Sequence, residues 1–180
     1  ALISPKASIE WLCLPVFDQK LVYTKALDPI NGDSVTLNFL KEGRELIPSS
    51  CSQDYIEKTN VLQTHLGCPD MKARIIDFMP WKGISEVLED KRIIYRVIKV
   101  KNTGSRKATF SVICKSSLKS ESNYAELQDG EVYHKDKDFV LGSIIKDTDN
   151  IELKAGEEKT CSVAIVYSPT IEGGKKRIRK

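Results

Sequence analysis

Residues 92–114, RIIYRVIKVKNTGSRKATFSVIC, contain two runs in which apolar and polar side chains alternate. This alternation places every second side chain on one face of an extended chain, the pattern of a half-buried β-strand. The two runs, 92–101 and 108–114, are separated by Asn102, Thr103, Gly104 and Ser105. Because a short polar connection with a glycine is typical of a hairpin, we predict two antiparallel strands joined by a tight turn.

Similar short runs occur along most of the chain. They cover residues 34–40, 59–66, 71–79, 131–134, 139–145, 150–153 and 159–167, with a turn at 154–158. No stretch of 12 or more residues has a helical apolar stripe, and the best short candidate, 85–90, allows at most a turn or two of helix. The pattern predicts an all-β fold: a large antiparallel β-sandwich of roughly nine or ten strands with few or no helices.

The charge distribution separates a body from a tail. The chain has 180 residues with 28 Lys and Arg against 25 Asp and Glu, but five of these cations lie among the last eight residues, so residues 1–172 carry 23 minus 25, a net charge of −2. We expect one β-sandwich domain over residues 1–172 and a basic flexible tail or truncated linker over 173–180. A body without a net positive charge argues against a nucleic-acid partner.

The sequence contains no sign of a membrane partner or of secretion. No apolar run approaches the roughly 20 residues that cross a bilayer, and the start, ALISP, has no secretory signal. Five cysteines at irregular intervals are typical of reduced thiols rather than of a disulfide framework. We therefore predict a cytoplasmic location. The chain also starts on apolar residues without an initiator Met, as if it were cut from a longer one.

Candidate chemical groups are few. The only histidines are His65 and His134, and there is no G-x-S-x-G motif. His65 and Cys68 have an H-x-x-C spacing with Cys51 upstream, but zinc sites usually contain two tight ligand pairs, so we expect no metal and no cofactor. A carboxylate pair for glycosidic cleavage has several candidates, between which spacing does not choose: Glu10, Asp18, Asp54, Asp70 and Asp77.

Two segments depart from simple strand alternation. In residues 4–18, SPKASIEWLCLPVFD, Trp, Pro, Phe and Asp crowd together, and in 77–81, DFMPW, an acidic residue and an aromatic residue flank a Pro. A structural interpretation is an aromatic plug of the core with polar residues at its corner.

The same segments resemble a known family. Residues 2–18, LISPKASIEWLCLPVFD, are similar to the opening of the trehalase-like N-terminal domain of prokaryotic glycoside hydrolase family 15, the glucoamylases, glucodextranases and trehalases. Tyr55, the segment 59–64, TNVLQT, and the segment 76–80, IDFMP, resemble further family motifs in the same order. The resemblance is strong over residues 2–80. The chain departs from the family pattern at a few positions: Ala7 for a turn Gly, Val16 for Arg, Gln19-Lys20 for Ser-Pro, and SNYA at 122–125.

The resemblance implies an antiparallel sandwich that precedes an (α/α)6 barrel, and in this family the two catalytic glutamates belong to the barrel. This chain has no helical periodicity for a barrel, so no catalytic residue is carried over and we expect the chain alone to be inactive. Its partner would be the barrel, in cis or in trans, together with an α-glucan or trehalose. The expected substrate or interdomain contacts are Trp11, Phe17, Asp18, Asp77 and Trp81. Aromatic rings pack on pyranose faces, and carboxylates accept hydrogen bonds from sugar hydroxyls or barrel donors.

Two other functions remain open. A free-standing α-glucan-binding module would have an exposed platform of two or three aromatic rings. An assembly or interaction sandwich would have no role in sugar recognition.

Overall fold

The computed structural model describes residues 1–14, 21–80, 93–116, 123–127, 131–135, 140–146 and 150–168, with only the backbone described between residues 115 and 149 and at 168. These residues form fifteen β-strands and no helix, arranged in two antiparallel sheets. The all-β sandwich predicted from the alternation is thus confirmed. Phe17, Asp18, Trp81, the segment 85–90 and the tail 173–180 lie outside the described residues.

The smaller sheet has seven strands, mostly from the first third of the chain. In spatial order they are β1 (Leu2–Ile3), β2 (Ile9–Cys13), β4 (Val35–Lys41), β10 (Ala108–Ser116) and β14 (Ile151–Leu153), with β3 (Leu21–Tyr23) beside β2 and β5 (Arg44–Leu46) beside β4.

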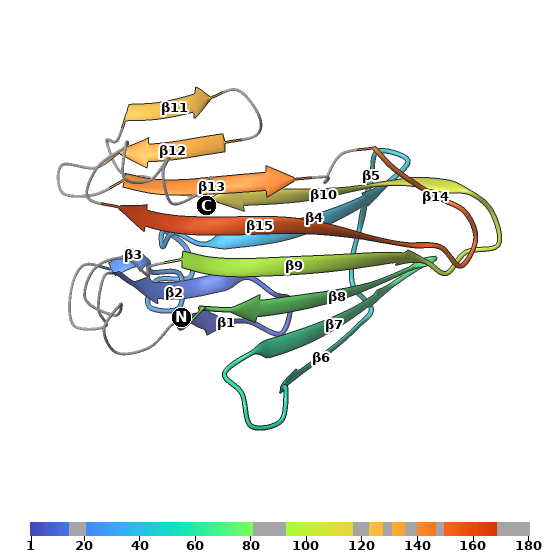
Figure 1. Cartoon of the computed structure of the whole chain (residues 1–180), viewed down its shortest axis with the longest axis horizontal. Helices are drawn as coiled ribbons and strands as arrows, with labels where there is room; N and C mark the ends of the chain where they lie inside the picture. Colours follow the sequence, from blue (N-terminus) through green and yellow to red (C-terminus); the bar gives the residue numbers. More distant parts are fainter. Residues whose placement is uncertain are drawn as a thin grey trace.

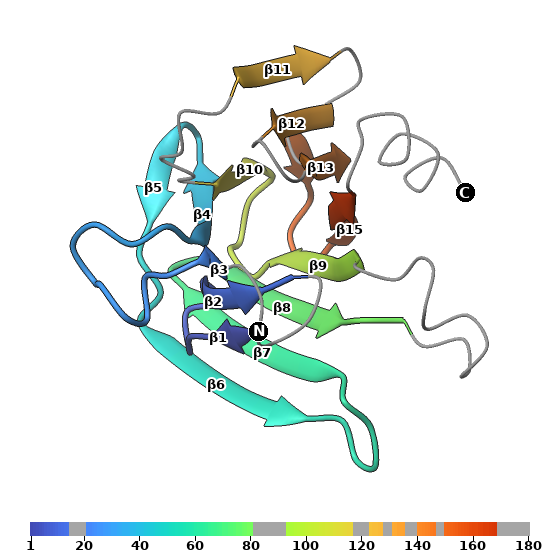
Figure 2. The same cartoon turned by 90° about the vertical axis from the view of Figure 1, so that its left-hand side faces the viewer.

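The larger sheet has eight strands and curves around the smaller one (Figures 1 and 2). In spatial order they are β11 (Asn123–Leu127), β12 (Glu131–Lys135), β13 (Val140–Lys146), β15 (Glu158–Ser168), β9 (Ile93–Asn102), β8 (Met71–Phe78), β7 (Leu62–Cys68) and β6 (Ser50–Tyr55).

The predicted hairpin between residues 92–101 and 108–114 is wrong. Strand β9 pairs with β8 and β15, whereas β10 pairs with β4 and β14 in the other sheet. The connection crosses between the sheets, and the residue before it, Asn102 at the end of β9, is fully buried. Its side-chain amide donates to the carbonyl oxygens of Arg106 (2.8 Å) and of Leu153 in the smaller sheet (3.0 Å).

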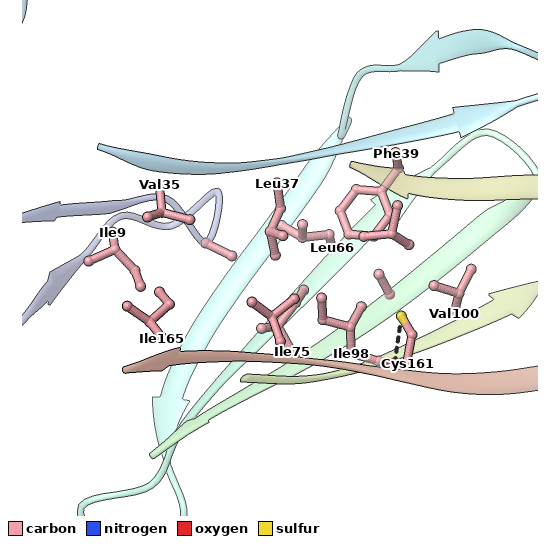
Figure 3. Close-up of a cluster of buried hydrophobic side chains, with 14 of the residues drawn as sticks. Ile9, Val35, Leu37, Phe39, Leu66, Ile75, Ile98, Val100, Cys161 and Ile165 are labelled. Atoms are coloured by element: carbon pink, nitrogen blue, oxygen red, sulfur yellow. Dashed lines mark hydrogen bonds between the residues drawn. The ribbon is translucent and has the colours of Figure 1, made fainter. Parts of the chain in front are cut away.

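The core lies between the two sheets and forms a single cluster of apolar side chains. Figure 3 shows Ile9, Val35, Leu37 and Phe39 of the smaller sheet facing the larger one. Their counterparts in the larger sheet include Leu66, Ile75, Ile98 and Ile165. Burial of each such side chain contributes roughly 1.5–3 kcal/mol, so this apolar layer is what holds the sheets together.

The turn between β1 and β2 places Ala7 in an unusual backbone conformation. Ala7 has φ of +60°, in the left-handed region that favours Gly, and it is fully buried. The backbone amide of Ala7 donates to the carbonyl oxygen of Ser4 (2.8 Å), and the amide of Ser4 donates to that of Ser8 (2.8 Å). Because a Cβ crowds the neighbouring backbone in this conformation, Ala7 carries local strain that a Gly would not.

Candidate functional site

The segments that carry the family resemblance come together at one end of the sandwich. We define the N-terminal corner as residues 2–13, 55–62 and 77–79. Gln53, just before it on β6, donates from Nε2 to the carbonyl oxygen of Ser4 (3.1 Å) and to Oγ1 of Thr64 (2.9 Å). These bonds join the β1–β2 turn to β6 and β7, and Figures 1 and 2 both show β1 beside β7. The fold thus brings together parts of the chain that are far apart in sequence, since Gln53 and Ser4 are separated by 49 positions.

Thr59 shapes the turn between β6 and β7. Its hydroxyl donates to the carbonyl oxygen of Ile56 (2.7 Å) and accepts from the amide of Val61 (3.1 Å), while the amide of Ile56 donates to the carbonyl of Val61 (3.0 Å). Beside this turn, Tyr55 is 66% exposed and Ile56 38% exposed. The corner therefore presents apolar side chains on a hydrogen-bonded turn.

One residue of the N-terminal corner, Asp77, belongs to a buried ion pair. Asp77 on β8 and Arg96 on β9 are directly opposite each other in register, on the face that carries the core. Nε of Arg96 donates to Oδ1 of Asp77 (2.6 Å) and Nη2 donates to Oδ2 (3.1 Å), and the two residues are only 0% and 3% exposed. Two parallel charge-assisted bonds hold both side chains in one geometry. Among the described residues, Nη1 of Arg96 has no hydrogen-bond partner.

The smaller sheet supplies a neighbour to this pair. Burial raises the pKa of the Cys114 thiol to about 11, an effect that the positive charge of Arg96 opposes and the negative charge of Asp77 reinforces. Cys114 is on β10, is partly exposed and packs against the core. The ion pair of the larger sheet therefore influences the pKa of a side chain in the smaller sheet.

The predicted contact residues have different placements. Trp11 pairs in register with Leu2 and keeps part of its surface exposed. Asp77 is buried, and both of its carboxylate oxygens accept bonds from Arg96, so the geometry favours an internal role over direct contact with a sugar or a barrel. Phe17, Asp18 and Trp81 lie outside the described residues.

The H-x-x-C spacing does not produce a ligand pair. His65 and Cys68 are an odd number of residues apart on β7, so their side chains lie on opposite faces, and Cys68 faces the core. His65 instead has Gln63 beside it, with 2.7 Å between the two Nε2 atoms. Within the described ranges no group of three His, Cys, Asp or Glu side chains is placed to hold a metal.

The sequence reasoning missed two features of β8 and β9. Arg96 is a lone cation inside the apolar run 93–98, and its position, two residues from Ile94 and Ile98, was a signal that it faces the core. Lys72 and Arg74 on β8, and Lys99 and Lys101 on β9, occupy alternate positions that a strand places on its other face. The tail 173–180 is therefore not the only basic cluster of the chain.

Comparison with protein-family models finds no match, and comparison with curated proteins finds no significant relative. In the part of the chain that the structure describes, no helix is long and apolar enough to cross a membrane.

Proposed function

We propose that the chain is a non-catalytic β-sandwich domain of a glucoamylase- or trehalase-like glycoside hydrolase, and that it supports the (α/α)6 catalytic barrel and borders the mouth of its active site. Three ordered sequence resemblances and the two-sheet antiparallel architecture support this function. We also infer that the protein acts in the cytoplasm and that the substrate of the barrel is an α-glucan or trehalose.

The observation that carries the proposal is the exposed apolar surface of the N-terminal corner. Leu2 is 58% exposed, Tyr55 66%, Ile56 38% and Met79 37%, and all four lie in or beside the segments that resemble the family. Single exposed apolar residues are common, but a group of them at one end of a domain is typical of a surface that another protein covers. In this scheme the Asp77–Arg96 pair positions the end of β8, and with it Met79, without touching the substrate.

The test has two parts. The purified 180-residue chain is expected to release no glucose from maltose, starch or trehalose. It is expected to bind the isolated helical barrel of a family 15 glucoamylase, measured by calorimetry. The double variant Tyr55→Ser, Met79→Ser should weaken that binding roughly tenfold or more, because truncation of central apolar contacts commonly costs more than about 1 kcal/mol each.

Leu27→Ser is the matched control, since Leu27 is 67% exposed but lies outside the corner. It should leave binding of the barrel unchanged. Glucose release by the chain alone, or equal effects of the corner and control variants, would contradict the proposal.

Calorimetry with maltooligosaccharides separates this function from a free-standing α-glucan-binding module. Tyr55 is the one aromatic residue among the strongly exposed apolar side chains of the described residues, and one ring does not make a platform. We therefore expect no heat of binding. Saturable binding of maltooligosaccharide without a barrel would favour the binding module.

A further inference from the structure

The outer face of β8 and β9 has four rows of directly opposed side chains. We call these eight residues the ladder face. Its rows, in order along β8, are Lys72 with Lys101, Arg74 with Lys99, Ile76 with Val97, and Phe78 with Tyr95. One half of the ladder face is therefore basic and the other half is apolar.

The burial pattern shows that these residues point away from the core. Met71, Ala73 and Ile75 of β8 and Ile98 and Val100 of β9 belong to the core cluster, so the alternate residues lie on the opposite face. Lys72 and Lys101 are exposed, and the remaining ladder residues are half-buried. In Figure 2 the smaller sheet lies on the inner side of the larger one, so the ladder face is on the outer, convex side.

The two basic rows are unfavourable for the isolated chain. Like charges directly opposite each other on neighbouring strands repel and destabilise the pairing. Among the described residues one carboxylate relieves this repulsion: Glu158 on β15 is directly opposite Lys101 in register, and its Oε1 lies 3.6 Å from Nζ of Lys99. One carboxylate faces four cations, and a carboxylate-bearing partner would compensate the remaining positive charge.

The shape of the ladder face restricts the class of partner. Neighbouring rows on one face of a strand are about 6.6–6.8 Å apart, which is also the spacing of alternate side chains in an extended peptide. A phosphate backbone gains nothing from the Ile76–Val97 row. Phe78 and Tyr95 stack on each other, with 5.5 Å between ring centroids and 22° between ring planes. Each ring covers one face of the other, so fewer ring faces remain on which the bases of a nucleic acid could stack. A flat, half-buried apolar row is also poorly shaped to enter a lipid layer.

We propose that the ladder face binds an acidic protein segment, whose carboxylates meet the Lys72–Lys101 and Arg74–Lys99 rows and whose apolar side chains meet the Ile76–Val97 and Phe78–Tyr95 rows. Complementary charge selects the partner and sets its register, and the apolar rows provide contact area. This inference does not depend on the proposed function: Phe78 is the one ladder residue within the N-terminal corner, whereas both basic rows lie outside it, on the side of β8 opposite to Asp77.

The test is an NMR titration of the full chain with a synthetic peptide, Glu-Ser-Glu-Ser-Val-Ser-Phe, which repeats the order of the rows. Backbone amide signals of β8 and β9 should shift saturably at millimolar peptide, and less as salt is raised, because screening weakens exposed charge pairs. The double variant Arg74→Gln, Lys99→Gln should weaken binding by about tenfold, the effect of losing two exposed ion pairs at the upper end of their usual strength.

Matched controls isolate the charges. The double variant Lys58→Gln, Lys154→Gln removes the same charge from exposed lysines outside the ladder face and should bind the peptide as the unaltered chain does. A peptide with Gln in place of both Glu residues should bind at least about tenfold more weakly.

Three outcomes would overturn the proposal: no shift of β8 and β9 signals, equal binding of the Gln peptide, or equal loss in the control variant. Tighter binding of an oligothymidylate or of phosphatidylserine vesicles at these strands would overturn it as well. The melting temperature of the single variant Arg74→Gln, which keeps the Lys99–Glu158 ion pair, provides a second measurement. It should not fall, since the substitution removes repulsion, and a fall would indicate that the basic rows stabilise the fold instead.

Discussion

At the level of single residues, burial of Asp77 and Arg96 removes a negative and a positive charge from water. Desolvation costs several kcal/mol for each ion, and the two hydrogen bonds between them offset this cost only while both partners are present. Nη1 of Arg96 adds a buried donor without a partner in the described structure. The pair therefore adds little net stability, although removal of one partner alone is costly.

We expect Asp77→Ala to lower the free energy of unfolding by about 3–5 kcal/mol, because it leaves the buried Arg96 charge unpaired. The double variant Asp77→Leu, Arg96→Met should recover most of this loss, since it removes both charges. Urea denaturation measures both values, and Asp54→Ala, at an exposed position, should stay within about 0.5 kcal/mol of the unaltered chain. Equal losses in the single and double variants would show that the charges do not matter.

Cys114 predicts a dependence of stability on alkaline pH. Its pKa is raised from 9.0 to about 11 by burial in the folded state. Between these values the unfolded chain binds fewer protons than the folded chain, so the contribution of the thiol to the free energy of unfolding is full below pH 9 and falls as pH rises toward 11. Urea denaturation at pH 8 and 10.5 should show a smaller stability difference between the unaltered chain and Cys114→Ala at the higher pH. Val112→Ala, on the same strand without a titratable group, should give a difference that does not change.

At the level of elements, the connection from β9 to β10 shows where local pattern stops being informative. Both strands were predicted within about two residues of their observed ends, yet their partners were wrong. Alternation shows which face of a strand is buried, but it does not name the strand beside it. Buried Asn102 fixes the course of this connection. Its side-chain amide donates to the carbonyl oxygen of Leu153 on β14, and its Oδ1 accepts from the backbone amide of Gly104 at 2.9 Å. Strand β6 was missed for a related reason: most of its side chains are exposed, so it lacks the apolar alternation of a half-buried strand.

Substitution of Asn102 by Ala should lower the free energy of unfolding by about 2–4 kcal/mol. It leaves the buried carbonyl of Leu153 without its donor and frees the carbonyl of Arg106 and the amide of Gly104. Asn102→Asp should also destabilise, since a carboxylate still accepts from Gly104 but does not donate. Asn60→Ala, at an exposed turn position, is the control and should have little effect. A loss below about 0.5 kcal/mol for Asn102→Ala would refute a connecting role.

At the level of the whole molecule, the two sheets share one core, because residues from both belong to the same buried cluster. Neither sheet buries its apolar face without the other. We therefore expect one cooperative unfolding transition, in which far-UV circular dichroism and tryptophan fluorescence give the same urea midpoint. Separate midpoints would show that the sheets unfold independently.

The net charge of the molecule does not show how its charges are distributed over the surface. The net charge of −2 over residues 1–172 argued against a basic face, yet β8 and β9 place four cations in two opposed rows. A sum over the chain contains no information about the register between strands. The two alternating cation pairs were visible in the sequence, but their juxtaposition depends on β8 pairing with β9.

The strand periodicity and the absence of helical stripes are local properties, and they were enough to establish an all-β chain and to locate most of its strands. The pairing of strands, the division into two sheets, the Asp77–Arg96 bond and the ladder face depend on contacts between residues far apart in sequence. Such contacts follow from hydrogen-bond register and from the packing of one apolar face on another. Both arise only when the sheets assemble, which is why the structure was needed to place the candidate site.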